Sequence, residues 1–129
     1  MNKRTVLCPG ILMTALVLCF SASSTVAQDI AKVAPGNVKV VMDNDKTRVL
    51  DVRFKAGEKL PVHSHPEHIV YAFSDGRIKT TLGDGKATET EFKAGQALWS
   101  DKVTHANEAL TDVHLLVIEI KDHNTMMKK

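Results

Sequence analysis

The residues best suited to chemistry are three histidines in two separate segments of the chain. His63 and His65 flank Ser64, and side chains two positions apart on a β-strand point to the same face, so this pair can bind one ion. His105 lies in another apolar segment. In a closed barrel the three imidazoles can converge, and a metal ion is the natural reason to bury ionisable groups there. The alternative is solvent-facing or hydrogen-bonded histidines without a metal.

Two residues directly after this pair could transfer a proton or supply a fourth metal ligand. They are Glu67 and His68, which follow Pro66. If a strand resumes directly after the proline, Glu67 shares its parity with Ile69 and could point inward, and His68 would then point outward. Proline commonly perturbs such a register. The choice therefore stays open, and a solvated loop is the alternative for both residues.

The elements that must position these side chains are predicted to be short β-strands. Apolar runs rich in Val, Ile, Phe and Tyr recur between turn signals, a pattern typical of an all-β sandwich or barrel. Strands are predicted at 38–42, 48–54, 69–73, 78–82, 88–92, 97–100, 105–108 and 113–120, and the histidine pair is expected on a further extended segment. Glycines mark the turns at Gly57, Gly76, Gly83, Gly85 and Gly95. No stretch has a convincing helical period, so helix is expected to be minor.

The chain also contains an internal echo. Residues 54–60 read FKAGEKL and residues 92–98 read FKAGQAL, so five of seven positions are identical. Each copy combines the end of a strand, a glycine turn and the start of a new strand, and each precedes a histidine segment. Two related halves are the interpretation that we favour, and chance recurrence of a common turn is the alternative.

These segments resemble the two motifs of the cupins. The first motif matches at Gly57, His63, His65 and Gly76, and the stretch from Gly95 to His105 is similar to the second. The resemblance covers about half of the chain after residue 27. It implies a small single-domain cupin, an all-β double-stranded β-helix or jelly-roll barrel of the RmlC-like type, commonly dimeric, with a divalent metal held inside one end.

The chain departs from the cupin pattern at an important position. Where the first motif has a glutamate ligand, this sequence has Ile69 or Val70. Glu67 and His68 are the nearest substitutes. The proline and glycine that precede the histidine of the second motif are also absent.

The first 27 residues are typical of a secretory signal. They contain Lys3 and Arg4, an apolar run over residues 11–20 and a cleavage site after Ala27, with no Asp or Glu. The apolar run is shorter than the roughly 20 residues that a membrane span needs. We therefore expect export, to the periplasm or the medium. The predicted organisation is signal 1–27, lead-in 28–36, cupin barrel 37–121 and a flexible tail 122–129.

The rest of the chain excludes several functional classes. Of 17 Lys and Arg residues two lie in the signal, which leaves 15 basic residues against 15 acidic ones. This balance gives no indication of nucleic acid or of a membrane partner after signal cleavage. Both cysteines, Cys8 and Cys19, also lie in the signal. Disulfides and thiol catalysis are therefore not expected in the exported domain.

The favoured hypothesis is a metal-dependent enzyme acting on a small molecule. His63, His65 and His105 would bind a divalent ion (Fe, Mn, Ni, Zn or Cu), and the open coordination positions suit dioxygenase, isomerase or lyase chemistry. A barrel that binds a small molecule or metal without turnover is the alternative, and a metal-free barrel is a third. A homodimer would cover exposed sheet edges. Imidazoles of ordinary pKa would release the metal between neutral pH and about 5.

Three aromatic residues and one more histidine are assigned to structural roles. Tyr71, Phe73 and Trp99 could line a ligand pocket, but aromatic residues on the strands of a small barrel are expected mainly in the core. His114 begins an apolar strand and is interpreted as structural. His123 lies in the predicted tail.

Overall fold

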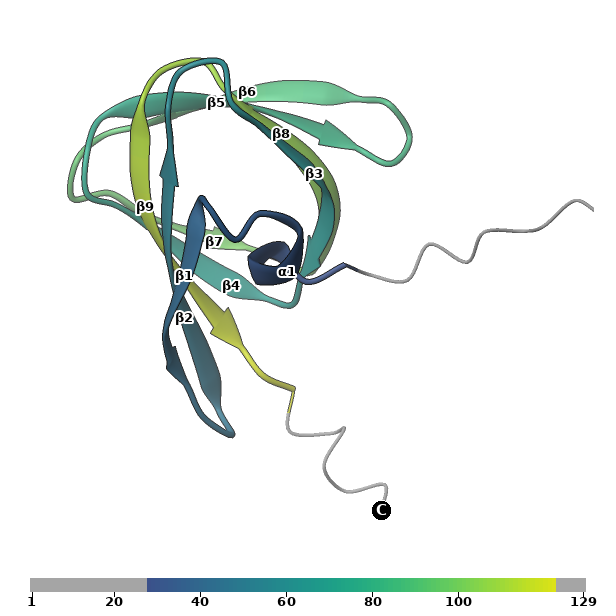
Figure 1. Ribbon diagram of the computed structural model, residues 1–129, viewed down its shortest axis with the longest axis vertical. Helices are drawn as coiled ribbons and strands as arrows, with labels where there is room; N and C mark the ends of the chain where they lie inside the picture. Colours follow the sequence, from purple (N-terminus) through teal and green to yellow (C-terminus); the bar gives the residue numbers. More distant parts are fainter. Residues whose placement is uncertain (1–27, 123–129) are drawn as a thin grey trace, which may run out of the picture.

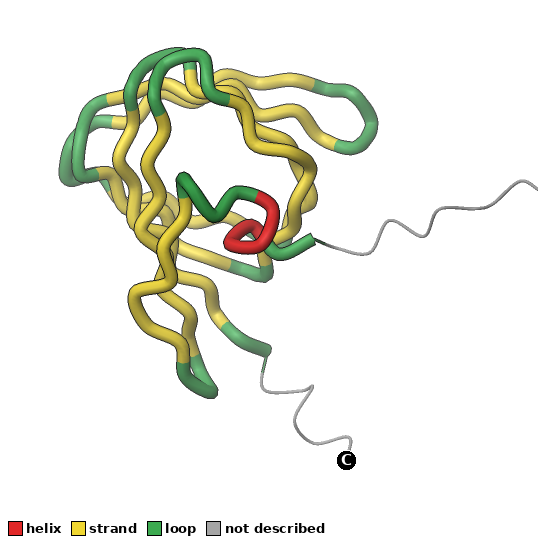
Figure 2. Tube along the Cα trace, in the orientation of Figure 1, coloured by secondary structure: helices red, strands yellow, loops and turns green. Residues whose placement is uncertain are grey.

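The computed structural model describes residues 28–122 and places almost all of them in two antiparallel β-sheets (Figures 1 and 2). One short helix, α1 (Ile30–Val33), precedes the strands. The strands are β1 (Val38–Asp43), β2 (Thr47–Phe54), β3 (Lys59–His65), β4 (His68–Ala72), β5 (Gly76–Leu82), β6 (Ala87–Phe92), β7 (Ala97–Ser100), β8 (Val103–Ala109) and β9 (Val113–Ile120). The predicted all-β architecture is confirmed, and helix in the described residues is limited to one turn.

The strands pair in an order that differs from their order along the chain. One sheet runs β1-β2-β9-β4-β7 and the other runs β3-β8-β5-β6. β1 and β2 are neighbours in the first sheet and β5 and β6 in the second, whereas all other pairs of consecutive strands lie in opposite sheets. Figure 1 shows this for β3 and β4, and the two sheets curve around a shared interior. Each predicted strand is present with its ends shifted by a few residues at most, and the histidine pair lies on β3.

The core fills the space between the sheets because the strands alternate inward and outward side chains. In β9, Val113, Leu115 and Val117 are buried while the residues between them are partly exposed. Leu50 and Val52 on β2 face the same interior and are 0% and 2% exposed. Burial of these aliphatic side chains stabilises the fold through the hydrophobic effect, by roughly 1.5–3 kcal/mol for each fully buried side chain.

The two copies of the sequence echo form equivalent turns. Phe54 and Phe92 end β2 and β6 and are buried, and Gly57 and Gly95 follow them with φ of 87° and 83°. These positive φ values explain the glycines, because a side chain would be strained there. The two turns also share a hydrogen bond. The backbone N–H of Lys55 donates to the side chain of Glu58 in the first turn, and the backbone N–H of Lys93 donates to the side chain of Gln96 in the second. The echo is therefore a repeated structural unit.

Residues 28–36, predicted as a polar lead-in, are part of the packed domain. Ile30 and Ala34 are buried in the hydrophobic core at 4% and 7% exposure. Asp29 caps α1 by accepting a hydrogen bond from the backbone N–H of Ala31. The backbone N–H of Ser64 in β3 donates to the carbonyl of Gln28 at 3.0 Å. The sequence missed this packing because a single helical turn has too few apolar positions to show a period.

The prediction that the strand aromatics are mainly core residues is wrong for two of them. Phe73 is 47% exposed and Trp99 is 57% exposed. Trp99 pairs with Ile69 across β7 and β4, and paired residues share a face of the sheet. That face is the outer one, since the intervening residues face the interior. The indole N–H of Trp99 donates to Asp101.

The predicted signal, residues 1–27, and the tail residues 123–129, which include His123, lie outside the described residues. Across residues 28–122 there is no helix with the length and apolar character that a membrane crossing requires.

Candidate metal centre

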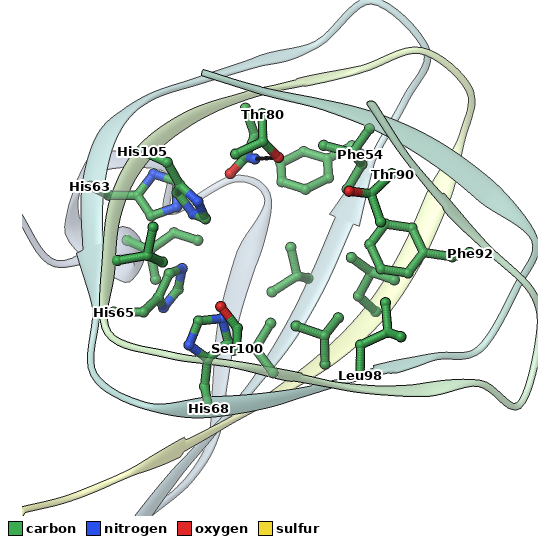
Figure 3. A pocket seen from close by; sticks show the side chains of 18 of the residues that line it. Phe54, His63, His65, His68, Thr80, Thr90, Phe92, Leu98, Ser100 and His105 are labelled. Carbon is green, nitrogen blue, oxygen red and sulfur yellow. Dashed lines mark hydrogen bonds between the residues drawn. The ribbon is translucent and has the colours of Figure 1, made fainter. Parts of the chain in front are cut away.

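Neighbouring strands of one sheet bring the three predicted ligand histidines together. In the antiparallel pair β3 and β8, His63 lies directly opposite His105, and His65 follows two positions later on the same face. One ligand atom from each ring lies within 4.8 Å of the other two. Figure 3 shows the three rings gathered on one side of the barrel interior. The convergence predicted from spacing is therefore present.

The hydrogen bonding of His63 prepares the ring to act as a ligand. Its Nδ1 lies 2.8 Å from the carbonyl oxygen of Pro61, which can only accept, so Nδ1 carries the proton. The lone pair is then on Nε2, which is fully buried and has no hydrogen-bond partner. A buried acceptor without a partner costs about 1–3 kcal/mol. A metal ion bound to Nε2 would remove that cost.

Burial favours the neutral form of two of the three histidines, His63 and His105. Burial lowers the pKa of His63 to about 4, despite the opposing hydrogen bond from its own ring to Pro61. Burial, followed by the neighbouring imidazoles, lowers the pKa of His105 to about 3. Metal ions bind the neutral imidazole. At neutral pH these rings therefore offer lone pairs without first losing a proton.

Sequence reasoning missed a buried carboxylate behind the cluster. Glu119 in β9 is 5% exposed, and its Oε1 lies 2.6 Å from Nδ1 of His65. The other carboxylate oxygen lies 3.7 Å from the guanidinium of Arg48. One signal was available in the sequence: Glu119 has the parity of Val113, Leu115 and Val117, so the alternation of β9 points it inward.

The structure distinguishes between the two candidate acid–base residues. His68 is the first residue of β4, is 3% exposed and faces the interior, with its ring centroid 4.7 Å from that of His65. Glu67 is exposed and lies outside the cavity that the histidines line. The inward orientation considered for Glu67 is therefore wrong. Glu67 does share the parity of Ile69, but this is the outer face of β4, because His68 and Ala72 are the residues that β4 buries in the interior.

His68 resembles His63 in its hydrogen bonding. Its Nδ1 donates to the carbonyl of Pro66 at 2.8 Å, so the lone pair is again on Nε2. Burial lowers the pKa of this imidazole as well. Its ligand atoms are not part of the group that lies within 4.8 Å. His68 is thus a neutral imidazole beside the three histidines.

The histidines line one end of a cavity of about 290 Å³. Figure 3 shows Phe54 and Phe92 across the interior from His63 and His105. The remaining lining is aliphatic, hydroxyl-bearing or amide, and includes the Thr80 hydroxyl, which accepts from the Asn107 amide at 2.9 Å. Within residues 28–122, the side chains that line this cavity include no Asp, Glu, Lys or Arg. The cavity therefore has imidazoles at one end and uncharged aromatic, aliphatic and threonine side chains at the other.

This donor set fits a divalent metal ion. Three imidazoles lie on one face, the buried Nε2 of His63 lacks a partner, and a carboxylate supports the ring of His65. Imidazole ligands suit Zn, Cu, Fe and Ni. The trio could hold such an ion while leaving the cavity side open to a small molecule.

His114 lies away from this cluster. It is on the outer face of β9, where its Nε2 lies 3.2 Å from Asp51 and its ring packs against Phe73. Its side chain is 28% exposed. These contacts agree with the structural role assigned to it.

The comparison with solved structures identifies the fold. No protein-family model matches the sequence, and no curated protein matches it. Among solved structures, a cupin domain from Bordetella pertussis Tohama I is similar with a TM-score of 0.60 and 22% identity, over 66% of this chain and 92% of that one. A cupin superfamily protein from Desulfitobacterium hafniense DCB-2 has a TM-score of 0.53 and 14% identity, over 66% and 76%.

A third structure describes the architecture directly. It is an RmlC-like cupin family protein with a double-stranded β-helix fold from Methanocaldococcus jannaschii, with a TM-score of 0.53 and 13% identity over 69% of this chain and 83% of that one. At these identities the similarity concerns the fold. The chain is a small domain with the cupin jelly-roll fold.

Proposed function

We propose that this protein is an exported small cupin that binds a divalent metal ion through His63, His65 and His105 and acts on a small molecule as a metal-dependent enzyme. The observation that carries the proposal is the buried Nε2 of His63, which has no partner and belongs to a group of three ligand atoms within 4.8 Å. Export rests on the basic, apolar and small-residue pattern of residues 1–27.

The metal, when bound, would act as a Lewis acid or redox centre toward a substrate oxygen or O₂ at an open coordination position. The chain itself supplies a base. His68 borders the cavity, and its Nδ1–H is held by the carbonyl of Pro66. The lone pair on Nε2 can therefore accept a proton from a molecule bound beside the three ligands. Glu67 is too exposed for this role.

The cavity lining favours an uncharged, largely apolar substrate. Phe54 and Phe92 occupy the end opposite the histidines, and the described lining provides no ionised side chain to pair with a charged group. Burying an unpaired charge there would be costly. We therefore expect one polar, oxygen-bearing group at the histidine end and an apolar remainder. Dioxygenase, isomerase and lyase reactions all agree with this arrangement.

Metal content is the first experiment. Protein containing residues 28–129 is recovered from the export compartment and compared with His63→Asn, His105→Asn and the control His114→Asn by elemental mass spectrometry. We expect near-stoichiometric Fe, Mn, Ni, Zn or Cu in the wild type and in the control, and loss in the other two. A wild-type protein that neither retains metal nor takes it up on addition would refute the proposal.

The second candidate function is a binding protein without turnover. One observation favours it: the residues that line the described cavity include no carboxylate, so His68 is the candidate base and there is no acidic alternative. A metal-loaded protein that binds neutral aromatic alcohols and returns them unchanged, with equal affinity in His68→Gln, would support this second function. Turnover that is lost in His68→Gln, with metal retained, would support the enzyme.

A further inference from the structure

We propose that Glu119 is the positioning carboxylate of the metal site and that Arg48 and Asp29 link it to the N-terminal segment, residues 28–34. This inference rests on the proposed metal binding. The inference adds a role for residues that do not contact the ion. It also makes metal affinity depend on how the N-terminal segment is packed.

The contact between Glu119 and His65 fixes which nitrogen of the ring can bind metal. The carboxylate Oε1 lies 2.6 Å from Nδ1, and the two side chains are only 7% and 4% exposed. An ionised carboxylate only accepts, so Nδ1 carries the proton and the lone pair is on Nε2. A carboxylate in this position also makes the imidazole a more basic ligand. The ring therefore has both its tautomer and its orientation set by Glu119.

Glu119 also supplies the charge that the ligands lack. Three neutral imidazoles leave the two positive charges of an ion uncompensated, and the glutamate ligand of the cupin motif is replaced by an apolar residue, Ile69 or Val70. Among the described residues, Glu119 is the one carboxylate hydrogen-bonded to a member of the trio. The negative charge of Glu119, one hydrogen bond away from a ligand, can therefore partly compensate the positive charge of the ion.

An arginine and an aspartate hold this carboxylate in turn. The Nη1 atom of Arg48 lies 3.7 Å from Oε2 of Glu119, and the same guanidinium donates two hydrogen bonds to Asp29 at 2.9 and 3.1 Å. The paired contacts to Asp29 fix the plane of the guanidinium. They also offset its positive charge, so that less of the charge of Glu119 is neutralised. The order of contacts is therefore Asp29, Arg48, Glu119, His65.

The N-terminal segment holds the histidine strand at a second point. Ser64 lies between the two ligands of β3, and its backbone N–H donates to the carbonyl of Gln28 at 3.0 Å. Asp29 forms a β-bridge with the same residue. One segment thus touches the histidine strand through its backbone and the supporting carboxylate through Arg48. Figure 1 shows α1 lying beside the lower part of β3.

The test measures Zn²⁺ affinity by competition with a chelator in Glu119→Gln, which keeps the size of the side chain and removes its charge. We expect binding about 10–100-fold weaker than in the wild type. The matched control is Asp51→Asn. Asp51 also contacts a histidine and an arginine, His114 and Arg53, but on the outer face of the same sheet. We expect its affinity to be unchanged.

A spectroscopic measurement on the metal-free protein separates positioning from a general loss of structure. In the wild type, the Nδ1 proton of His65 should give a strongly downfield ¹H–¹⁵N resonance because its bond to the carboxylate is short. That resonance should move upfield in Glu119→Gln while the amide resonances of β5 and β6 stay in place. Circular dichroism on each variant checks that the fold is retained.

A second variant tests the link to the N-terminal segment. Asp29→Asn keeps an acceptor for the helix cap, since Asn caps helices as well as Asp does, and removes the charge opposite Arg48. We expect Zn²⁺ affinity to fall by up to about fivefold, as for a partly exposed ion pair. This variant remains informative if Glu119→Gln does not fold.

The outcomes are distinguishable. A wild type that binds no Zn²⁺ would overturn the proposed function itself. A wild type that binds Zn²⁺, with Glu119→Gln equal to it in affinity and in the His65 resonance, would overturn the role of Glu119 alone. An equal loss of Zn²⁺ affinity in Asp51→Asn and Glu119→Gln would also overturn the role of Glu119, because the affinity would then depend on the overall charge of the protein.

Discussion

The buried histidines should make the metal-free protein sensitive to mild acid. Burial lowers the pKa of His63 in the folded state to about 4, whereas an unfolded histidine titrates near 6.5. Between these values the unfolded chain binds a proton that the folded chain does not. The free energy of unfolding therefore falls as the pH is lowered through 6.5, and the loss is complete near pH 4.

The size of this effect follows from the width of the window. Each pH unit inside it costs about 1.36 kcal/mol for one group. From pH 6.5 to 5.0, His63 alone should lower the free energy of unfolding by about 2 kcal/mol. For a domain of this size that corresponds to a fall in Tm of roughly 8–16 °C.

The assay compares wild type with His63→Asn after removal of metal. Asn keeps an N–H donor for the carbonyl of Pro61 and does not titrate. Chemical unfolding followed by circular dichroism at pH 7.5 and 5.0 gives the free energies. The wild type should lose about 2 kcal/mol more than the variant over this interval. His114→Asn, a change on the outer face, should behave as the wild type does.

One outcome would contradict this prediction. If wild type and His63→Asn lose the same stability between the two pH values, burial does not hold His63 in its neutral form.

Three further predictions concern single contacts. Because the pKa values of His63 and His105 are about 4 and about 3, the three-histidine site should keep Zn²⁺ down to about pH 5 and release it at lower pH. This release pH is lower than the one expected from histidines of ordinary pKa. Equilibrium dialysis that finds the site empty at pH 6 would contradict the prediction. Gly76→Ala should cost about 1–3 kcal/mol in thermal unfolding because its Cβ would lie 2.2 Å from Cγ1 of Val113, whereas Gly36→Ala, with nothing within 4 Å, should be nearly neutral. Leu50→Ala, at a fully buried position, should cost about 2–5 kcal/mol while the folded fraction still binds Zn²⁺.

Much of the fold was predictable because its signals are local. Apolar runs of strand length, turn glycines and the repeated FKAG segment are each read within a few residues. The pairing of His63 with His65 is also local, since it depends only on strand parity. What local signals could not provide was the packing of residues 28–36, whose few apolar side chains become core residues through contacts with distant strands.

The all-β barrel and the three candidate ligands could be predicted from the sequence. The groups that surround these ligands became apparent in the folded structure. His68 and Glu119 lie directly opposite each other in β4 and β9, so both face the interior, and this register places Glu67 outside. Register is fixed by pairing between strands that are far apart in the chain, and a shift of one residue reverses every side chain. For that reason the contact of Glu119 with His65, 54 positions away, appears only in the folded chain.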